Sequence, residues 1–280
     1  MHVLDYQNFV MGNAHDSYKV FGAHKTVVDG VEGFVFRLYA PHAKAVELVG
    51  DFNSWQGYKN KMTKVDINGV WETFVPNIKD YQNYKYHILT AQNMWVDKID
   101  PFSFFSELRP KNASRTYDID GFIWHDEKFI SKRNLNLNKA MNIYELHLGS
   151  WVKANDRFFS YSELAEKLVE YLNNKGYTHV EILPISEHPL DMSWGYQCSG
   201  YFSATSRYGN PKQLMSLIDV LHQNGIGVIF DFVPVHFVKD DFGLINFDGA
   251  PIYESDDENK RYNSWGSINF DYSKGPVKSF

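Results

Sequence analysis

The chain has 280 residues, is 44% hydrophobic and carries a formal net charge of −6, a composition typical of water-soluble globular proteins with one or two domains. No basic block or interleaving of basic and aromatic residues indicates a nucleic-acid partner. No apolar run reaches the roughly 18 residues of a membrane-spanning helix, so no membrane partner is expected. Asp5 and Gln7 lie where a signal peptide needs an apolar core, and we therefore expect a cytoplasmic protein.

Cysteine and acidic residues give no sign of a redox or metal site. Cys198 is the only cysteine, which excludes an internal disulfide and favours a packing residue over a nucleophile. No group of ligand residues has zinc spacing, and the acidic run at residues 256–258 lacks the spacing of a calcium loop and is expected to be solvated. Neither a metal nor an organic cofactor is therefore expected.

Aromatic residues are abundant: 18 Tyr, 21 Phe and 7 Trp make up 16% of the chain. An aromatic ring combines an apolar face with a polar edge or tip, which suits interfaces and the flat C–H faces of sugars. The same residues also fill hydrophobic cores, so composition alone leaves both interpretations open.

After an N-terminal extension of residues 1–19, the chain follows a two-residue periodicity. In GFVFRLYAP, Phe34, Phe36 and Leu38 fall on one side and the alternate residues on the other, which predicts a half-buried strand. Short strands separated by turns predict an all-β, immunoglobulin-like sandwich over residues 20–130. The other predicted strands are KAVELVG (44–50), VWETFVP (70–76) and NYKYHILT (83–90), with turn signals at Asp29-Gly30 and Asn68-Gly69.

A polar stretch, SKRNLNLNKA, is the predicted linker at residues 131–140, and beyond it the pattern changes. Three apolar, strand-like runs follow at residues 141–149, 179–185 and 225–233, within a second predicted domain of residues 141–280. Amphipathic helical runs separate these strands. Alternating β and α elements with apolar strands predict a parallel sheet covered by helices, either doubly wound or a (β/α) barrel.

Both helical runs carry start and stop signals. Ser160 and Glu163 form a capping-box pattern, and Gly176 lies where that helix should end. Asn210 is the predicted cap of the second helix, with Pro211 in its first turn.

Polar and aromatic side chains crowd the segments that follow the three predicted strands. In both α/β architectures, functional groups gather at these C-terminal strand ends. The segment from Val238 to about Pro276 is long and aromatic, as loops that build a site are. No Gly-rich phosphate loop follows the first strand, so the residue types favour a sugar over a nucleotide. The side chains are Glu145, His147, Trp151, Glu187, His188, Asp191, Trp194, Tyr196, Asp231 and His236.

Each of these residues also has a purely structural interpretation. Asp231 could brace the following loop by accepting backbone N–H bonds, and His236 could be a satisfied, semi-buried histidine. Trp194 and Tyr196 could be core aromatics, and Glu187 and His188 could be one solvated pair.

Several short motifs of the sequence resemble those of a known family. GDFNSW (residues 50–55) resembles the signature of the carbohydrate-binding module that precedes α-glucan branching and debranching enzymes. YELHLGSW (144–151), EHPLDMSWGYQ followed by GYFSATSRYG (187–209), DFVPVHF (231–237) and FDGAPIYE (247–254) together resemble bacterial 1,4-α-glucan (glycogen) branching enzymes of the α-amylase superfamily. The resemblance runs from about Val20 to Phe280, and it implies that the second domain is the first part, about three β/α units, of a TIM-type (β/α)8 barrel.

The resemblance also implies a sugar-binding set. Asp231 would support the floor of the active site, His236 would hydrogen-bond the sugar beside the scissile bond, and Tyr196 would stack on that sugar. Trp194 and Gln197 belong to the same WGYQ motif and complete the implied set. Most members of the family have Trp and Gly where this chain has Phe232 and Val235, which changes side-chain volume without removing a polar group.

The implied chemistry is retaining transfer of an α-1,4-glucan segment to a 6-hydroxyl, with a carboxylate nucleophile and a carboxylic acid that protonates the leaving oxygen. In the family these groups come from later barrel strands, so the nucleophile Asp and the acid Glu are expected beyond Phe280. We therefore expect an N-terminal fragment with no catalytic residue of its own, inactive alone.

Two other functions fit parts of the sequence. A related debranching or trehalose-releasing hydrolase shares the sandwich signature, although EHPLDMSWGYQ favours branching. A non-catalytic protein that binds α-glucan (glycogen or amylose) would use the sandwich, with Trp55, Trp71 and Trp95 as candidate contacts, of which we expect Trp71 to be core. The sequence does not indicate an oligomeric state.

Overall fold

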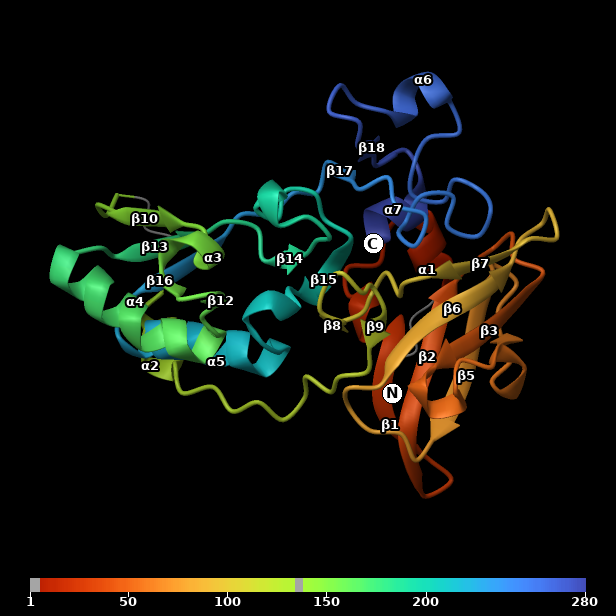
Figure 1. The fold of residues 1–280 in the computed structure, drawn as a ribbon, viewed down its shortest axis with the longest axis horizontal. Helices are drawn as coiled ribbons and strands as arrows, with labels where there is room; N and C mark the ends of the chain where they lie inside the picture. The colour runs from red at the N-terminus through yellow and green to blue at the C-terminus, as the bar shows by residue number, and fades with distance from the viewer. Residues whose placement is uncertain (1–5, 134–137) are drawn as a thin grey trace.

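The computed structural model describes residues 6–133 and 138–280, and its first half is a sandwich of two antiparallel sheets (Figure 1). One sheet has the strand order β1-β2-β5-β4. The other has the order β3-β6-β9-β8, with β7 also pairing β6. The predicted strands are confirmed. The strands are β1 (Gly22–Val28), β2 (Val31–Tyr39), β3 (Ala45–Gly50), β4 (Thr63–Lys64), β5 (Val70–Pro76), β6 (Asn83–Leu89), β7 (Trp95–Lys98), β8 (Phe105–Ser106) and β9 (Ser114–Arg115).

The turn signals form as predicted. Asp29 and Gly30 connect β1 to β2 with φ values of 49° and 79°, the left-handed conformations that a tight hairpin needs. The expectation of a half-buried strand is wrong for β2, because Val35 and Tyr39 on the second side are also buried. The Tyr39 ring contacts Phe9, with the ring centroids 5.1 Å apart.

Phe9 belongs to α1 (Tyr6–Met11), a helix in the segment predicted as an N-terminal extension. Its side chain is 1% exposed and lies in the same hydrophobic core as the sandwich strands. Helix α1 also packs against α7 (Gly275–Ser279), and the Ala14 amide donates to Ser279 Oγ at 3.3 Å. The first and last described helices therefore lie side by side (Figure 1).

The second half contains a parallel sheet of order β10-β13-β16, formed by β10 (Ile143–Leu146), β13 (His179–Ile182) and β16 (Gly227–Phe230). Helices α4 (Tyr161–Lys175) and α5 (Pro211–Gln223) pack against each other and share a core with the sheet residues Leu146, Val180 and Ile182. This is the alternation that the sequence predicted.

The helix signals act as expected. The Ser160 hydroxyl accepts from the Glu163 amide, the Glu163 carboxylate accepts from the Ser160 amide, and Gly176 takes a left-handed φ of 73° at the C-cap. Asn210 caps α5 in the same way, with Pro211 in the first turn. Both helix starts are therefore fixed by residues close in sequence.

The remaining elements are short and lie mainly in the connections. They are η1 (Ser17–Lys19), η2 (Asp51–Asn53), η3 (Gly57–Lys59), α2 (Glu127–Lys132), α3 (Leu148–Trp151), β11 (Lys153–Ala154), β12 (Arg157–Phe158), β14 (Ser186–Glu187), η4 (Asp191–Ser193), β15 (Gly200–Ala204), η5 (Ser206–Tyr208), β17 (His236–Phe237), α6 (Glu258–Arg261) and β18 (Ile268–Asn269).

Two segments join the halves. Helix α2 packs on α5, where the Phe129 ring stacks on His222 at 4.3 Å. The first two residues of the predicted linker, Ser131 and Lys132, belong to α2, and its residues 134–137 lie outside the described residues. The long segment after β16 returns to the sandwich, because Phe237, Phe247 and Tyr253 belong to the sandwich core. The long segment thus joins the sandwich core, while the parallel sheet with α4 and α5 has a separate core of its own.

The edges of the parallel sheet are open among the described strands. Strand β16 pairs with β13 alone. Apolar side chains are exposed near these edges: Ile143 is 41% exposed, Phe230 42% and Phe232 63%. A cavity of about 300 Å³ lies between α5, β15 and the end of β16.

Candidate functional site

The C-terminal ends of β10, β13 and β16 bring three connecting segments together. Because the strands are parallel and in register from Ile143, His179 and Gly227, their last residues end at the same edge of the sheet. The segments that follow carry His147, then the loop from Glu187 to Tyr196, then Asp231. Polar side chains distant in sequence therefore meet at one place, as in other parallel α/β folds.

Asp231 and Tyr196 form the centre of this group. The Tyr196 hydroxyl donates to Asp231 Oδ2 at 2.5 Å. This hydrogen bond, followed by burial, raises the pKa of Tyr196 to about 12. The Asp231 amide donates to Ile182 O at 3.0 Å, which places the aspartate directly at the end of the sheet. The Asp231 side chain thus accepts from another predicted site residue, whereas the purely structural interpretation expected backbone N–H donors.

Trp194 lies beside this pair and stacks on His147, with ring centroids 5.7 Å apart and an angle of 16° between the planes. Trp194 is 51% exposed and Tyr196 39%, so the alternative that both are core aromatics is wrong. Burial, followed by the charge of Arg207, lowers the pKa of His147 and favours the neutral ring. Gln197 is partly buried next to Tyr196.

His236 comes from β17, whose short pairing with β18 places His236 opposite Asn269. The residue is 8% exposed, and its Nδ1 atom has no hydrogen-bond partner among the described residues. Burial lowers the pKa of the ring, which favours the neutral form. No described residue therefore satisfies this nitrogen.

Trp265 was not among the predicted site residues. It is 75% exposed and lies edge-on to His236, with ring centroids 5.8 Å apart. The Asn263 carbonyl oxygen of the side chain accepts from the amides of Trp265 and Ser267, which fixes the turn. Sequence reasoning noted that this segment is aromatic, but the contact depends on a two-residue strand pairing that no periodicity reveals.

Glu187 and His188 are not a solvated pair, and that interpretation is wrong. Their exposed fractions are 7% and 2%. Glu187 Oε1 accepts from Arg207 Nη1 at 2.6 Å, and Glu187 Oε2 accepts from the Ser206 amide at 2.8 Å. The partner lies 20 residues further along the chain, so a buried ion pair was not visible in the local sequence.

The described residues contain no cluster of three or more His, Cys, Asp or Glu side chains placed to bind a metal ion. Within the same residues, no helix is long and apolar enough to cross a membrane. Cys198 is buried, and burial raises the pKa of its thiol to about 12, which matches the expected packing role. The arrangement at the strand ends offers hydrogen-bonding groups and exposed rings, which is the chemistry of a sugar site.

Two family models match the chain. Residues 20–103 match carbohydrate-binding module 48 (isoamylase N-terminal domain), and residues 160–266 match the α-amylase catalytic domain. These matches agree with the sandwich and with the start of an α-amylase-type catalytic domain, the fold that the sequence motifs implied.

Solved structures with the same fold have low sequence identity to this chain. The catalytic module of SpuA, a glycogen-degrading pneumococcal virulence factor, gives a TM-score of 0.70 at 20% identity and covers 97% of this chain and 44% of that one. A putative alpha amylase from Salmonella typhimurium gives 0.69 at 22% identity, covering 93% and 40%. These structures show the fold alone.

Sequence relatives are much closer. The 1,4-alpha-glucan branching enzyme GlgB of Bacillus subtilis (strain 168) is 47% identical over 276 residues, which cover 97% of this chain and 44% of the relative. The corresponding enzyme of Gloeobacter violaceus is 44% identical over 284 residues, covering 99% and 39%. The chain spans less than half the length of these curated relatives. Over nearly its whole length it is similar to bacterial 1,4-α-glucan branching enzymes, as its motifs predicted.

Proposed function

We propose that this chain supplies the glucan-binding sandwich and one wall of the sugar site of a 1,4-α-glucan branching enzyme. The whole enzyme would transfer an α-1,4-glucan segment to a 6-hydroxyl and so form the α-1,6 branches of glycogen. The observation that carries this proposal is the hydrogen bond between Tyr196 and Asp231, at the strand ends of a segment that matches the α-amylase catalytic domain. The similarity to branching enzymes over 97% of the chain supports the branching reaction.

In this proposal each side chain has a distinct role. The exposed Tyr196 ring stacks on a glucose unit while its hydroxyl fixes Asp231. The neutral His236 ring offers its unpartnered Nδ1 to a sugar hydroxyl, which would satisfy a buried polar atom that otherwise costs free energy. Trp194 and Gln197 lie close to Tyr196 in the same loop. None of these groups is the nucleophile or the acid of retaining transfer, which we propose come from further strands of the catalytic domain.

The sandwich is the second proposed glucan contact. Trp55 and Trp95 are each 44% exposed, and Trp95 stacks on His87 with centroids 4.3 Å apart and planes within 2°. The Trp55 Nε1 atom donates to Asp51 Oδ1 at 3.1 Å, which fixes the ring at the end of GDFNSW. Trp71, in contrast, is 7% exposed and donates to Ala40 O, so it lies in the core as expected. Two fixed, exposed rings suit α-glucan binding.

Three measurements on the purified 280-residue chain test the proposal. Calorimetric titration with maltoheptaose should show binding that weakens in Tyr196→Ala, and glycogen in a native gel should retard the wild type more than Trp55→Ala/Trp95→Ala. Incubation with amylose, followed by enzymatic debranching, should release no chains from new α-1,6 linkages. New linkages would contradict the assignment of the nucleophile and acid to other strands, and absence of maltoheptaose binding would contradict the sugar site.

The cytoplasmic location remains a prediction. Fractionation of cells that express the tagged chain, with detection in the cytosolic fraction, would test it.

A further inference from the structure

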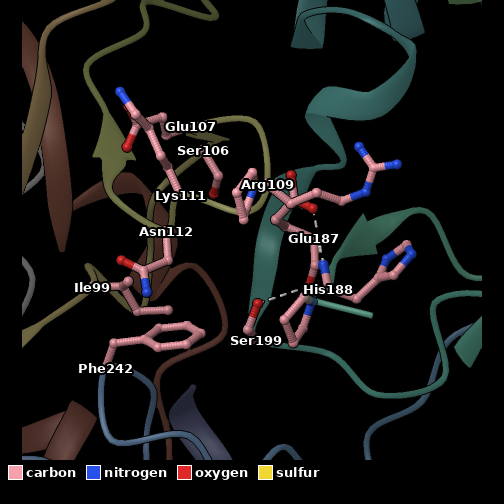
Figure 2. A pocket seen from close by; sticks show the side chains of 12 residues that line it. Ile99, Ser106, Glu107, Arg109, Lys111, Asn112, Glu187, His188, Ser199 and Phe242 are labelled. Atoms are coloured by element: carbon pink, nitrogen blue, oxygen red, sulfur yellow. Dashed lines mark hydrogen bonds and ion pairs between the residues drawn. The ribbon is translucent and has the colours of Figure 1, made fainter. Parts of the chain in front are cut away.

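A line of four charged side chains connects the sandwich with the loop that carries Trp194 and Tyr196. Arg109, in the connection between β8 and β9, donates from Nε and Nη2 to the two carboxylate oxygens of Asp191. Arg207 donates from Nε to Asp191 Oδ1 at 2.8 Å and from Nη1 to Glu187 Oε1 at 2.6 Å. Figure 2 shows Arg109 extending from the sandwich loop beside Glu187, next to an interdomain cavity of about 60 Å³.

Asp191 is the first residue of η4 and begins the turn that ends at Tyr196. Its carbonyl accepts from the Trp194 amide at 3.1 Å, and the Ser193 carbonyl accepts from the Tyr196 amide at 3.0 Å. Trp194 has a φ of 52°, a left-handed conformation that a tryptophan rarely adopts unless its surroundings impose it. The position of Asp191 therefore sets the positions of both rings that follow.

Arg207 alone does not fix Asp191. It contacts only Oδ1 and directs its other bonded nitrogen to Glu187, and the Asp191 side chain is 42% exposed. The planar fork of Arg109 engages both oxygens, so it fixes the carboxylate plane as well as its distance. Burial raises the pKa of Asp191, but the hydrogen bonds from Arg109 and Arg207 outweigh it and keep the pKa below its ordinary value.

We propose that Arg109 is a positioning residue through which the sandwich places the sugar-contacting loop of the catalytic half, acting on Trp194 and Tyr196 by way of Asp191. The sugar contact rests on the proposed function, whereas the placement of the loop does not. The sandwich would then contribute to the sugar site of the other half without touching the sugar there.

The reactivity of Cys198 can show whether the loop is held in place, and no ligand is needed for the measurement. Its thiol donates to Gly195 O at 3.1 Å and is buried, so it reacts only when this loop moves. In the native chain near pH 8, Arg109→Gln should increase the rate of Cys198 alkylation by iodoacetamide about fivefold, the loss expected for a partly exposed, bidentate ion pair. Lys111→Gln is the matched control, because it removes one positive charge from the same connection at a side chain that is 73% exposed.

Two further variants separate positioning from general destabilisation. Asp191→Asn should give an increase at least as large, because it also weakens the contact with Arg207. The double variant Arg109→Gln/Asp191→Asn should react no faster than Asp191→Asn alone, since Arg109 acts through Asp191. Arg109→Lys should recover part of the protection, because lysine keeps the charge and loses the fork. If Arg109→Gln does not fold, Asp191→Asn carries the test with Arg109 intact.

The same variants are then titrated with maltoheptaose. Arg109→Gln should weaken the Tyr196-dependent part of binding about fivefold and leave glycogen retardation by the sandwich and the melting temperature close to wild type. Unchanged Cys198 reactivity in Arg109→Gln and Asp191→Asn would overturn the proposal. If the variants are alkylated faster but the wild-type chain does not bind maltoheptaose, the positioning role is supported and the proposed sugar function is overturned instead.

Discussion

Tyr196 and Asp231 lie 35 residues apart in sequence, and the Tyr196 hydroxyl donates to Asp231 Oδ2 where β13 and β16 end. The bond joins the loop after one parallel strand to the loop after the next. The bond therefore forms only when the two loops are in place. The ring and the hydroxyl of Tyr196 have different roles in the proposed site, and substitutions can test them separately.

Tyr196→Phe should keep ring stacking and lose the fixed position of Asp231. We expect maltoheptaose affinity to fall by less than in Tyr196→Ala, with a change in the free energy of unfolding of about 1 kcal/mol or less. Calorimetry and denaturant unfolding of the three proteins measure both quantities. A Phe variant as weak as the Ala variant would show that the hydroxyl, and not the ring, dominates binding.

The Tyr196 bond should also give the stability of the folded chain a defined pH dependence. An unperturbed tyrosine has a pKa near 10, and the value in the folded chain is raised to about 12. Because folding raises this pKa, the contribution of the hydroxyl to the free energy of unfolding is complete below pH 10 and is lost as the pH rises through 12. The difference in the free energy of unfolding between wild type and Tyr196→Phe, measured by denaturant unfolding, should therefore be constant from pH 7 to 10, and a decline within that range would contradict the assigned bond.

Trp265→Ala tests the ring that sequence reasoning missed. Because the side chain is 75% exposed, its loss should hardly change the melting temperature, while maltoheptaose affinity should fall about fivefold through the loss of one stacking surface. Trp124→Ala is the control, since that ring is also partly exposed but packs against Phe122 on the segment between the halves. Equal losses of affinity in both variants would remove Trp265 from the site.

Features set by neighbouring residues were predictable from the sequence. The Ser160–Glu163 capping box and the Asp29-Gly30 hairpin depend on atoms within a few residues, so the sequence pattern determines them. The resemblance to a family supplied Asp231 and His236, which no local pattern distinguishes from structural residues. It did not supply their contacts.

Features set by distant residues were not predictable. Glu187 is buried because Arg207 compensates its charge, and Tyr39 on the second side of β2 is buried where Phe9 of α1 packs against it. A pattern of apolar and polar residues along the chain cannot reveal either case, since the partner is too distant in sequence to affect the local periodicity.

Gly275→Ala should loosen the contact between the first and last described helices. A Cβ at Gly275 would collide with the Val10 carbonyl oxygen, so α1 and α7 must separate. We expect the free energy of unfolding to fall by about 1–3 kcal/mol, measured by denaturant unfolding, with faster amide exchange in α1. Gly243→Ala is the control, because a Cβ there approaches only Asp240 O, at 3.2 Å. Equal stability of the two variants would show that α1 is not tightly packed.

Lys98 should make the joint between the halves depend on pH. The residue lies in β7, is 3% exposed, and donates from Nζ to Asp241 O at 2.6 Å and to Ile245 O at 2.7 Å in the long segment after β16. Burial lowers its pKa to about 8, against roughly 10.4 for an exposed lysine. Burying the charge is therefore costly, and the cost is complete below pH 8.

As the pH rises from 8 to about 10.4, the buried amine loses its charge while the unfolded chain keeps its own, so the wild type should gain stability, by about 3 kcal/mol over the whole interval. Lys98→Met lacks this gain and leaves two carbonyls without their donor. Denaturant unfolding at several pH values should show the wild type exceeding Lys98→Met by a margin that grows between pH 8 and 10. Buried tyrosines titrate equally in both proteins and cancel in the difference, so a margin that stays constant or shrinks would mean that Lys98 is not buried with a lowered pKa.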